Sequence, residues 1–126
     1  MRIAGYAAIF DHVDHGGDIV RKGAFGKVAA ALPLFRQHDS RRRIGTVEQA
    51  TEDARGLRVI ASLVKGEVVP EGAGLSFGYR VRKARNGTYR QLFDLDLIEI
   101  SVVETPMQPL ARVLKTEITP KETDYE

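Results

Sequence analysis

The 126-residue chain has 43% hydrophobic and 29% charged residues, which fits one globular domain with a real core. It contains no cysteine, so disulfides, thiolate zinc sites and a cysteine nucleophile are excluded. The net charge is only +2, and no apolar run approaches the roughly 18 residues of a membrane helix. We therefore expect neither a nucleic acid nor a membrane as a partner.

Strand patterns dominate the chain from its start. In chain order, strands are predicted at IAGYAAIF (3–10), DIV (18–20), LFRQHD (34–39), IGTVEQATED (44–53), GLRVIASLV (56–64), LSFGYRVRKA (75–84) and TYRQLFDLDLIEISVV (88–103). Two hairpin turns are predicted, at Asp53–Gly56 and around Asn86-Gly87, a dipeptide that favours tight turns.

One stretch has a helical pattern, from about Phe25 to Leu32, and Pro33 stops it. From Lys115 onward the chain is polar and unpatterned, which predicts a domain over residues 1–114 and a loose tail over 115–126. The predicted fold class is mostly β, a β-barrel or strongly bent sheet with one or two short helices.

The sequence GLSFG (74–78) fits the G-x-S-x-G pattern of a nucleophile elbow. An α/β-hydrolase needs a strand before that serine, a helix after it, and the order serine, acid, histidine. Here a strand follows Ser76, and the three histidines, His12, His15 and His38, all precede it. The α/β-hydrolase interpretation is therefore excluded.

Ser76 can still be a nucleophile, because a triad is defined by geometry rather than by chain order. A serine hydroxyl needs a base, and His38 ends a predicted strand, which would hold an imidazole rigidly. The alternative is that His38 caps a turn and Ser76 only begins a strand. The pattern alone favours this alternative. The remaining serines, Ser40, Ser62 and Ser101, are expected to be dispensable.

Alternation in the last long strand places a carboxylate among apolar residues. One face is predicted to carry Phe93, Leu95, Leu97, Glu99, Ser101 and Val103, and the other, more mixed face Leu92, Asp94, Asp96, Ile98 and Ile100. A buried Glu99 needs a partner, which can be an imidazole or an arginine. The residues leave these two partners open, and Asp96 and Glu104 stay as alternative acids.

Two other clusters point to different chemistry. The stretch DHVDHGGD offers the metal ligands Asp11, His12, Asp14, His15 and Asp18, and basic residues gather at Arg41–Arg43 and at Arg80, Arg82, Lys83 and Arg85. The first cluster lacks a second ligand set elsewhere, so we expect no metal and no other cofactor. The second lacks interleaved aromatic residues, which favours solvated or peptide-contacting positions over a nucleic-acid site.

Four segments carry a resemblance to a known family. They are GYAAIFDHVDHGGDIVRKGAF (5–25), FRQHD (35–39), GLSFGYRV (74–81) and LDLIEISVVETPMQPLARV (95–113). In this order they resemble the prohead serine proteases of tailed bacteriophages, over nearly the whole domain. The segment between Val64 and the serine motif, KGEVVPEGAG, is shorter than is usual in that family.

The resemblance implies an assemblin-like fold and a serine endopeptidase that trims scaffold or capsid protein during head maturation. By motif match, His38 is the histidine of QHD, Ser76 the serine of GLSFGY and Glu99 the acid of EIS. It also implies action inside the assembling procapsid, in the bacterial host cytoplasm. Self-cleavage and a homo-oligomer stay open. The alternative function is a non-catalytic β-barrel module that docks on capsid or scaffold protein.

Overall fold

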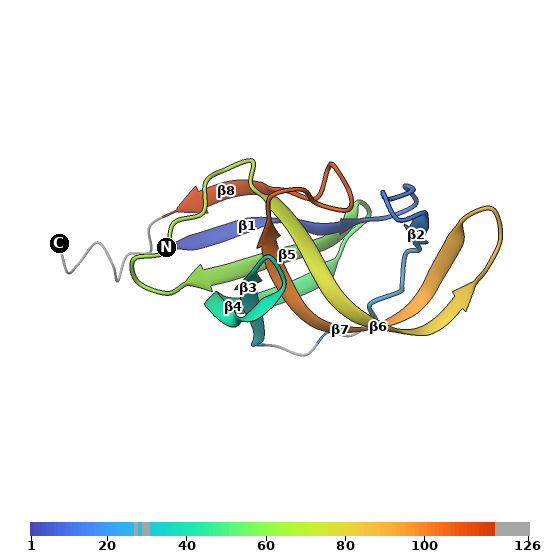
Figure 1. The fold of residues 1–126 in the computed structure, drawn as a ribbon, viewed down its shortest axis with the longest axis horizontal. Coiled ribbons are helices and arrows are strands. Elements are labelled where there is room, and N and C mark those ends of the chain that lie inside the picture. Colours follow the sequence, from blue (N-terminus) through green and yellow to red (C-terminus); the bar gives the residue numbers. More distant parts are fainter. Residues whose placement is uncertain (27, 29–30, 118–126) are drawn as a thin grey trace.

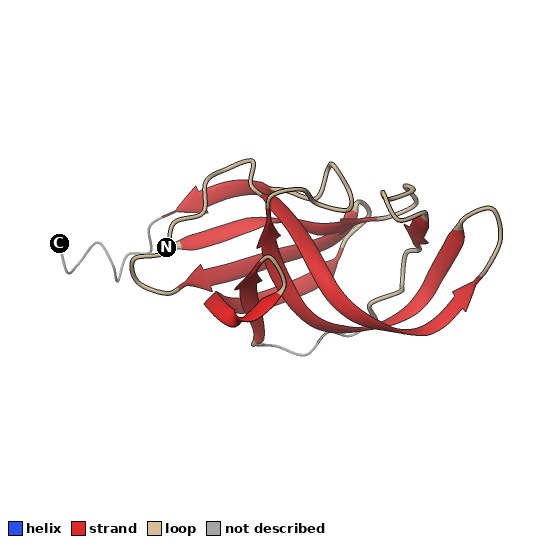
Figure 2. Ribbon diagram, in the orientation of Figure 1, coloured by secondary structure: helices blue, strands red, loops and turns tan. Residues whose placement is uncertain are grey.

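The computed structural model describes residues 1–26, 28 and 31–117 (Figure 1). These residues form eight strands and no helix (Figure 2). The strands are β1 (Arg2–Ile9), β2 (Asp18–Val20), β3 (Leu32–Arg36), β4 (Asp39–Glu52), β5 (Gly56–Leu63), β6 (Gly74–Arg85), β7 (Arg90–Val103) and β8 (Val113–Glu117). No helix in this part of the chain could cross a membrane.

The strands form one bent sheet in the order β2-β7-β3-β4-β5-β1-β8, and β6 pairs with β7 outside this path. The sheet has free ends at β2 and β8, so it is not a closed barrel. The long β6–β7 hairpin crosses over the strands β1 and β5, and its tip extends beyond the rest of the molecule (Figure 1). The predicted mostly β fold class is thus found as an open, bent sheet rather than a barrel.

Strand β7 connects the two halves of the sheet. It runs parallel to β2 at residues 90–92 and parallel to β3 at residues 100–102, and it pairs antiparallel with β6 along most of its length. The C-terminal part of β7 therefore lies between β3 and β6. Side chains from these three neighbouring strands can meet there although they are far apart in the sequence.

The predicted helix of about Phe25–Leu32 is not found in the described residues. Phe25 lies in a turn and Leu32 already begins β3, whereas residues 27, 29 and 30 lie outside the described part. Pro33 stops the helical pattern, but it does so inside a strand, close to the strand start where proline is tolerated. Pairing with Val47 of β4 overrides the local helical pattern at Leu32.

The C-terminal end of the described chain also differs from the prediction. Strand β8 pairs with β1, with Lys115 opposite Ala4, and continues to Glu117. Three residues that the pattern assigned to the loose tail thus belong to the sheet, because β1 offers them a strand edge. The rest of the predicted tail, residues 118–126, lies outside the described residues, and the domain division stays a prediction.

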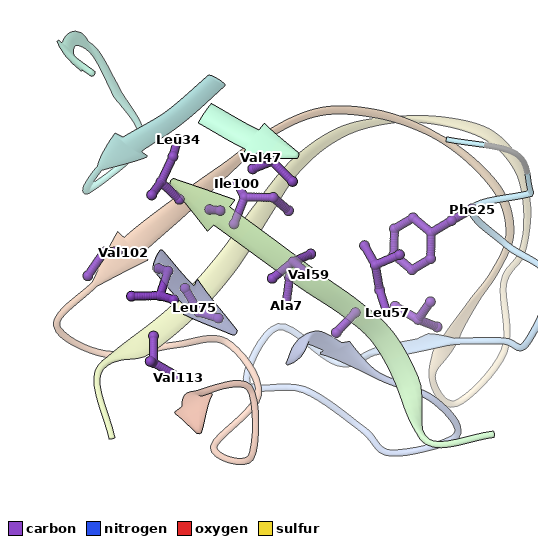
Figure 3. Packing of buried hydrophobic residues seen from close by; sticks show 14 of the residues in the cluster. Ala7, Phe25, Leu34, Val47, Leu57, Val59, Leu75, Ile100, Val102 and Val113 are labelled. Atoms are coloured by element: carbon purple, nitrogen blue, oxygen red, sulfur yellow. The ribbon is translucent and has the colours of Figure 1, made fainter. Parts of the chain in front are cut away.

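The core contains buried aliphatic residues from most strands. Figure 3 shows Leu34, Val47 and Ile100 in one part of this core and Leu75 and Val113 in another. Fully burying a side chain of this size contributes about 1.5–3 kcal/mol. Leu75 and Ile100 directly precede Ser76 and Ser101, so core packing fixes the backbone that carries these two serines.

Candidate active site

The three residues expected to form the site come from adjacent elements. Ser76 lies near the start of β6, Glu99 lies in β7, and His38 lies in the turn that joins β3 to β4. In the β6–β7 ladder, Ser76 is opposite Ser101 and Gly78 is opposite Glu99. Since β3 pairs with the other edge of β7 at residues 100–102, the turn after β3 reaches the same end of the sheet.

His38 was predicted to lie at the end of a strand. In the structure it lies in a tight turn instead. Arg36 and Asp39 pair across the turn, and the two residues between them, Gln37 and His38, have φ values of 51° and 57°. Positive φ at both central positions is the geometry of a type I′ hairpin turn. It costs a non-glycine residue energy, and persists where the surroundings hold it.

Three hydrogen bonds hold this turn against β7 and the residue that follows it. The Gln37 amide donates to the Val102 carbonyl at 2.9 Å, and the Gln37 side-chain oxygen accepts from the Glu104 amide at 2.6 Å. The His38 amide donates to Ser101 Oγ at 3.1 Å. The base is thus presented from a turn whose backbone is attached to the strand that carries the acid.

The side chains of His38, Ser76 and Glu99 form a continuous chain of hydrogen bonds. Nε2 of His38 lies 3.0 Å from Ser76 Oγ, and Nδ1 lies 2.5 Å from Glu99 Oε1. A neutral imidazole with its proton on Nδ1 satisfies both contacts, because Nδ1 then donates to the carboxylate and Nε2 accepts from the hydroxyl. This is the arrangement of nucleophile, base and orienting acid.

The site is buried on the side of the acid and open on the side of the base. Ser76 and Glu99 are each 7% exposed, whereas the imidazole of His38 is 43% exposed. The hydrogen bond and negative charge of Glu99 raise the pKa of His38 above its ordinary value of 6.5, and partial burial opposes this rise. The carboxylate therefore favours the imidazolium that forms when His38 takes a proton.

Glu99 fits here because the residue opposite it has no side chain. A Cβ added at Gly78 would lie 2.3 Å from Glu99 Oε1 and 2.9 Å from its carboxyl carbon. Gly78 is the second glycine of the G-x-S-x-G pattern. In this protein it leaves room for the Glu99 carboxylate and does not form a nucleophile elbow. A β-bulge follows at once, since Tyr79 pairs with Leu97 and leaves Ile98 without a partner in the ladder.

The predicted alternation in β7 is correct for the acids and wrong for two apolar residues. Glu99 is buried, and Asp94 and Asp96 are exposed, as predicted. Leu92 and Ile100 were assigned to the more polar face, yet both are completely buried. The bulges in the β6–β7 ladder break the strict period of two, and both faces of β7 are covered from residue 99 to 102.

Ser101 is a further residue of this hydrogen-bonded network, and the sequence motifs did not point to it. Ser101 was expected to be dispensable, but it is 0% exposed and its Oγ donates to Glu99 Oε2 at 2.7 Å. The available signal was the E-I-S spacing, since residues two apart on a strand share a face. The structure thus adds this serine to the hydrogen-bonded network of the site.

The alternative acids lie elsewhere. The side chain of Asp96 is 51% exposed and forms an ion pair with Arg82. Glu104 is exposed and meets the turn through its backbone amide, which donates to the side chain of Gln37. Neither carboxylate contacts an imidazole among the described residues. This leaves Glu99 as the acid of the network.

The acidic and histidine-rich stretch near the start of the chain is divided among separate contacts. Asp11 pairs with Arg21, and the Asp14 side chain accepts hydrogen bonds from the amides of Gly16 and Asp18. Among residues 1–26, 28 and 31–117, no group of three or more histidines or carboxylates is arranged to hold a metal ion. In this conformation the stretch builds a turn.

Comparison with protein families gives the site its context. A family model described as caudovirus prohead serine protease matches residues 1–124. The chain belongs to this family. It is therefore a serine peptidase of phage head maturation, as the four motifs predicted, and family membership favours this enzyme over a non-catalytic docking module.

Comparison with solved structures supports the fold. The protease resembles the KSHV protease, a herpesvirus enzyme whose crystal structure is in complex with a hexapeptide phosphonate inhibitor. The TM-score is 0.61 at 8% sequence identity, and the match covers 98% of this chain and 73% of the herpesvirus chain. The assemblin-like fold is thus confirmed at an identity that says nothing about individual residues. No curated protein matches the chain.

Proposed function

We propose that Ser76, His38 and Glu99 are the nucleophile, base and acid with which this protease cleaves the capsid and scaffold proteins of its phage. The observation that carries the assignment is the chain of contacts from Ser76 Oγ through both imidazole nitrogens to the Glu99 carboxylate. The site of action is the assembling prohead, in the cytoplasm of the host.

The first half of the reaction forms an acyl-enzyme. Ser76 Oγ attacks the carbonyl carbon of the scissile peptide while His38 Nε2 takes the hydroxyl proton. Glu99 holds Nδ1–H and stabilises the imidazolium. When the C–N bond breaks, Nε2 returns the proton to the leaving amine. The new N-terminus departs, and the acyl group stays on Ser76.

The second half releases the acid product. Water attacks the acyl carbon, His38 takes a proton from this water, and the ester bond to Ser76 breaks. The proton then returns to Ser76 Oγ, so the enzyme is regenerated. Because the imidazole is partly open to solvent, water can reach Nε2 once the amine has left.

A labelling experiment tests the assignment. The wild-type protease should react with a fluorophosphonate probe, and mapping should locate the adduct on Ser76. Ser76→Ala should lose both labelling and cleavage of the phage capsid and scaffold proteins. Matched variants at two serines outside the network, Ser40→Ala and Ser62→Ala, should keep most of both activities.

Two outcomes would contradict the triad. Cleavage by purified Ser76→Ala protein at the wild-type rate would exclude Ser76 as the nucleophile. Loss of activity in EDTA with recovery on adding zinc would favour a metal mechanism, whereas the serine mechanism requires full activity in the chelator.

A further inference from the structure

Ser101 joins the backbone of the base to the side chain of the acid. It lies in β7 directly opposite Ser76 and has no exposed surface. Its Oγ donates to Glu99 Oε2 at 2.7 Å and accepts from the His38 amide at 3.1 Å. A hydroxyl can serve both contacts at once, since it has one proton to donate and lone pairs to accept.

The contact with Glu99 sets the direction of the carboxylate. Oε1 faces His38 and Oε2 faces Ser101, so the carboxylate is held at both oxygens. The last torsion of a glutamate side chain is otherwise broad, with a weak preference between orientations. Among the described residues, Oε2 has no other hydrogen-bond partner. Without the hydroxyl, a buried oxygen of a charged group would lose its only donor.

The contact with His38 acts on the turn. Ser101 Oγ accepts a hydrogen bond from the backbone amide of His38. His38 has a φ of 57°, a conformation that needs support from its surroundings. Two further hydrogen bonds attach Gln37 to residues 102 and 104, yet only the Ser101 contact ends at the base itself. The same hydroxyl therefore fixes both partners of the short Nδ1–carboxylate contact.

We propose that Ser101 is a positioning residue for catalysis, which aligns Glu99 and His38 with each other and thereby with Ser76. The inference rests on the proposed triad, because it gives Ser101 a role only through these two residues. Ser101 itself touches neither the substrate nor the proton that moves.

Three substitutions separate positioning from packing. Ser101→Ala removes the hydroxyl, Ser101→Cys keeps the volume but offers only a weak donor, and Ser101→Thr restores the hydroxyl. Ser62→Ala in β5 is the matched control, since it removes a strand serine outside the network. Each protein is first compared with wild type by circular dichroism and thermal unfolding. Ser101→Cys serves as the primary variant if the alanine variant does not fold.

Steady-state kinetics over a pH series is the measurement. A hydrogen bond to a charged group contributes enough to expect an about ten- to hundredfold lower kcat in Ser101→Ala and Ser101→Cys, with KM nearly unchanged. The pKa of His38, read from the acid limb of kcat/KM, should fall towards its ordinary value because the Glu99 contact that raises it is loosened. Ser101→Thr should recover most of kcat.

The proposal is overturned if folded Ser101→Cys keeps the wild-type kcat, or if Ser101→Thr is as slow as Ser101→Cys. It is also overturned if the acid limb stays in place or moves to higher pH, since either result would mean that the His38–Glu99 contact had not loosened. These outcomes leave the triad intact. The triad is contradicted by different results, such as an active Ser76→Ala protein or loss of activity in EDTA with recovery on adding zinc, so the two proposals fail separately.

Discussion

Two buried carboxylates, Glu99 and Asp18, lie at opposite ends of β7 and meet different partners. Glu99 is 7% exposed and Asp18 is 9% exposed, so burial alone does not distinguish them. Glu99 belongs to β7 itself, near its C-terminal end. Asp18 opens β2 and is paired in register with Arg90, the first residue of β7.

Asp18 has a permanently charged partner. Its two carboxylate oxygens accept from Nε and a terminal nitrogen of Arg90 at 2.9 and 2.8 Å, which is a bidentate pair. The guanidinium lowers the pKa of Asp18, and burial opposes this. Glu99 instead meets an imidazole, whose charge changes near neutral pH. The first pair can only hold β2 on β7, whereas the second can take part in proton transfer.

The comparison shows that a buried carboxylate does not identify an active site by itself. From the sequence, an imidazole and an arginine were both possible partners of Glu99, and Asp18 was a possible metal ligand. Each carboxylate took one of the two partner types. The partner, and not the carboxylate, decides between a structural contact and a catalytic one.

The largest predicted effect is a loss of kcat on substitution of Glu99, which Asp18 should not share. Glu99→Gln keeps the side-chain shape but removes the charge that stabilises the imidazolium, so kcat should fall about a hundredfold or more with little change in KM. Asp18→Asn should leave kcat within a few-fold of wild type. It should instead lower the free energy of unfolding by about 1–3 kcal/mol, because Arg90 loses its charged partner but is half-exposed and can turn to water.

Kinetics and urea unfolding of both variants check this prediction. If Asp18→Asn kept its fold but lost most of its kcat, catalysis would depend on the N-terminal end of β7 and not only on the end that carries Glu99. A Glu99→Gln enzyme with near-normal kcat would remove the acid from the triad.

The next effect concerns the space that Glu99 needs. In Gly78→Ala, the new methyl group would collide with the carboxylate and displace it from His38, so kcat should fall at least about tenfold. Gly87→Ala is the matched control in the same hairpin, since its nearest atom would be 3.5 Å away. The two variants are compared in kcat and in melting temperature. Equal activity of both would mean that Glu99 does not require an empty position opposite it.

The residues at the two ends of β7, His38 and Asp18, should also differ in how pH changes their contributions to activity and stability. The pKa of His38 is raised, so kcat/KM should fall as the pH drops through a value above 6.5, where the base becomes protonated. The same shift stabilises the fold fully below about pH 6.5, and this contribution is lost as the pH rises through the higher folded-state pKa. Activity and the His38-linked stability therefore change in opposite directions.

Asp18 behaves in the opposite sense. Its pKa is lowered from 3.8, so its contribution to stability is present above about pH 4 and is lost as the pH falls through the lower folded-state pKa. Thermal unfolding is followed from pH 3 to pH 9. Asp18→Asn should lose the change in stability at acidic pH, and His38→Ala should lose the change near neutral pH. An acid limb of kcat/KM below pH 6.5 would contradict the Glu99 contact.

The smallest effect is expected at the exposed acids between the two ends. Asp94 and Asp96 lie near Arg82 on the β6–β7 hairpin, with all three side chains more than half exposed. Exposed pairs of this kind contribute about 0–1 kcal/mol. Asp94→Asn and Asp96→Asn should therefore change neither kcat nor stability by a measurable amount. A hundredfold loss in Asp96→Asn would show that the acid of the site had been misassigned.

Local patterns in the sequence were sufficient to predict most of the strands and to identify the candidate site residues. The alternation of apolar residues predicted seven of the strands, and Asn86-Gly87 predicted the β6–β7 hairpin. The motifs containing Ser76, His38 and Glu99 identified residues that the structure brings into one network. The predictions of the strands, the hairpin and the family succeeded because strand period, turn chemistry and family motifs are properties of short segments.

Tertiary structure decided everything that depends on how the strands are ordered. His38 lies 61 positions from Glu99 and 38 positions from Ser76, and only the placement of β7 between β3 and β6 brings the three together. The same placement buried Ser101, and the β6–β7 register put Glu99 opposite Gly78, which has no side chain. Pairing with Val47 of β4 made Leu32 a strand residue, and the free edge of β1 did the same for Lys115. A single segment cannot contain this information, since each contact depends on the register of a strand pair whose two members are distant in the chain.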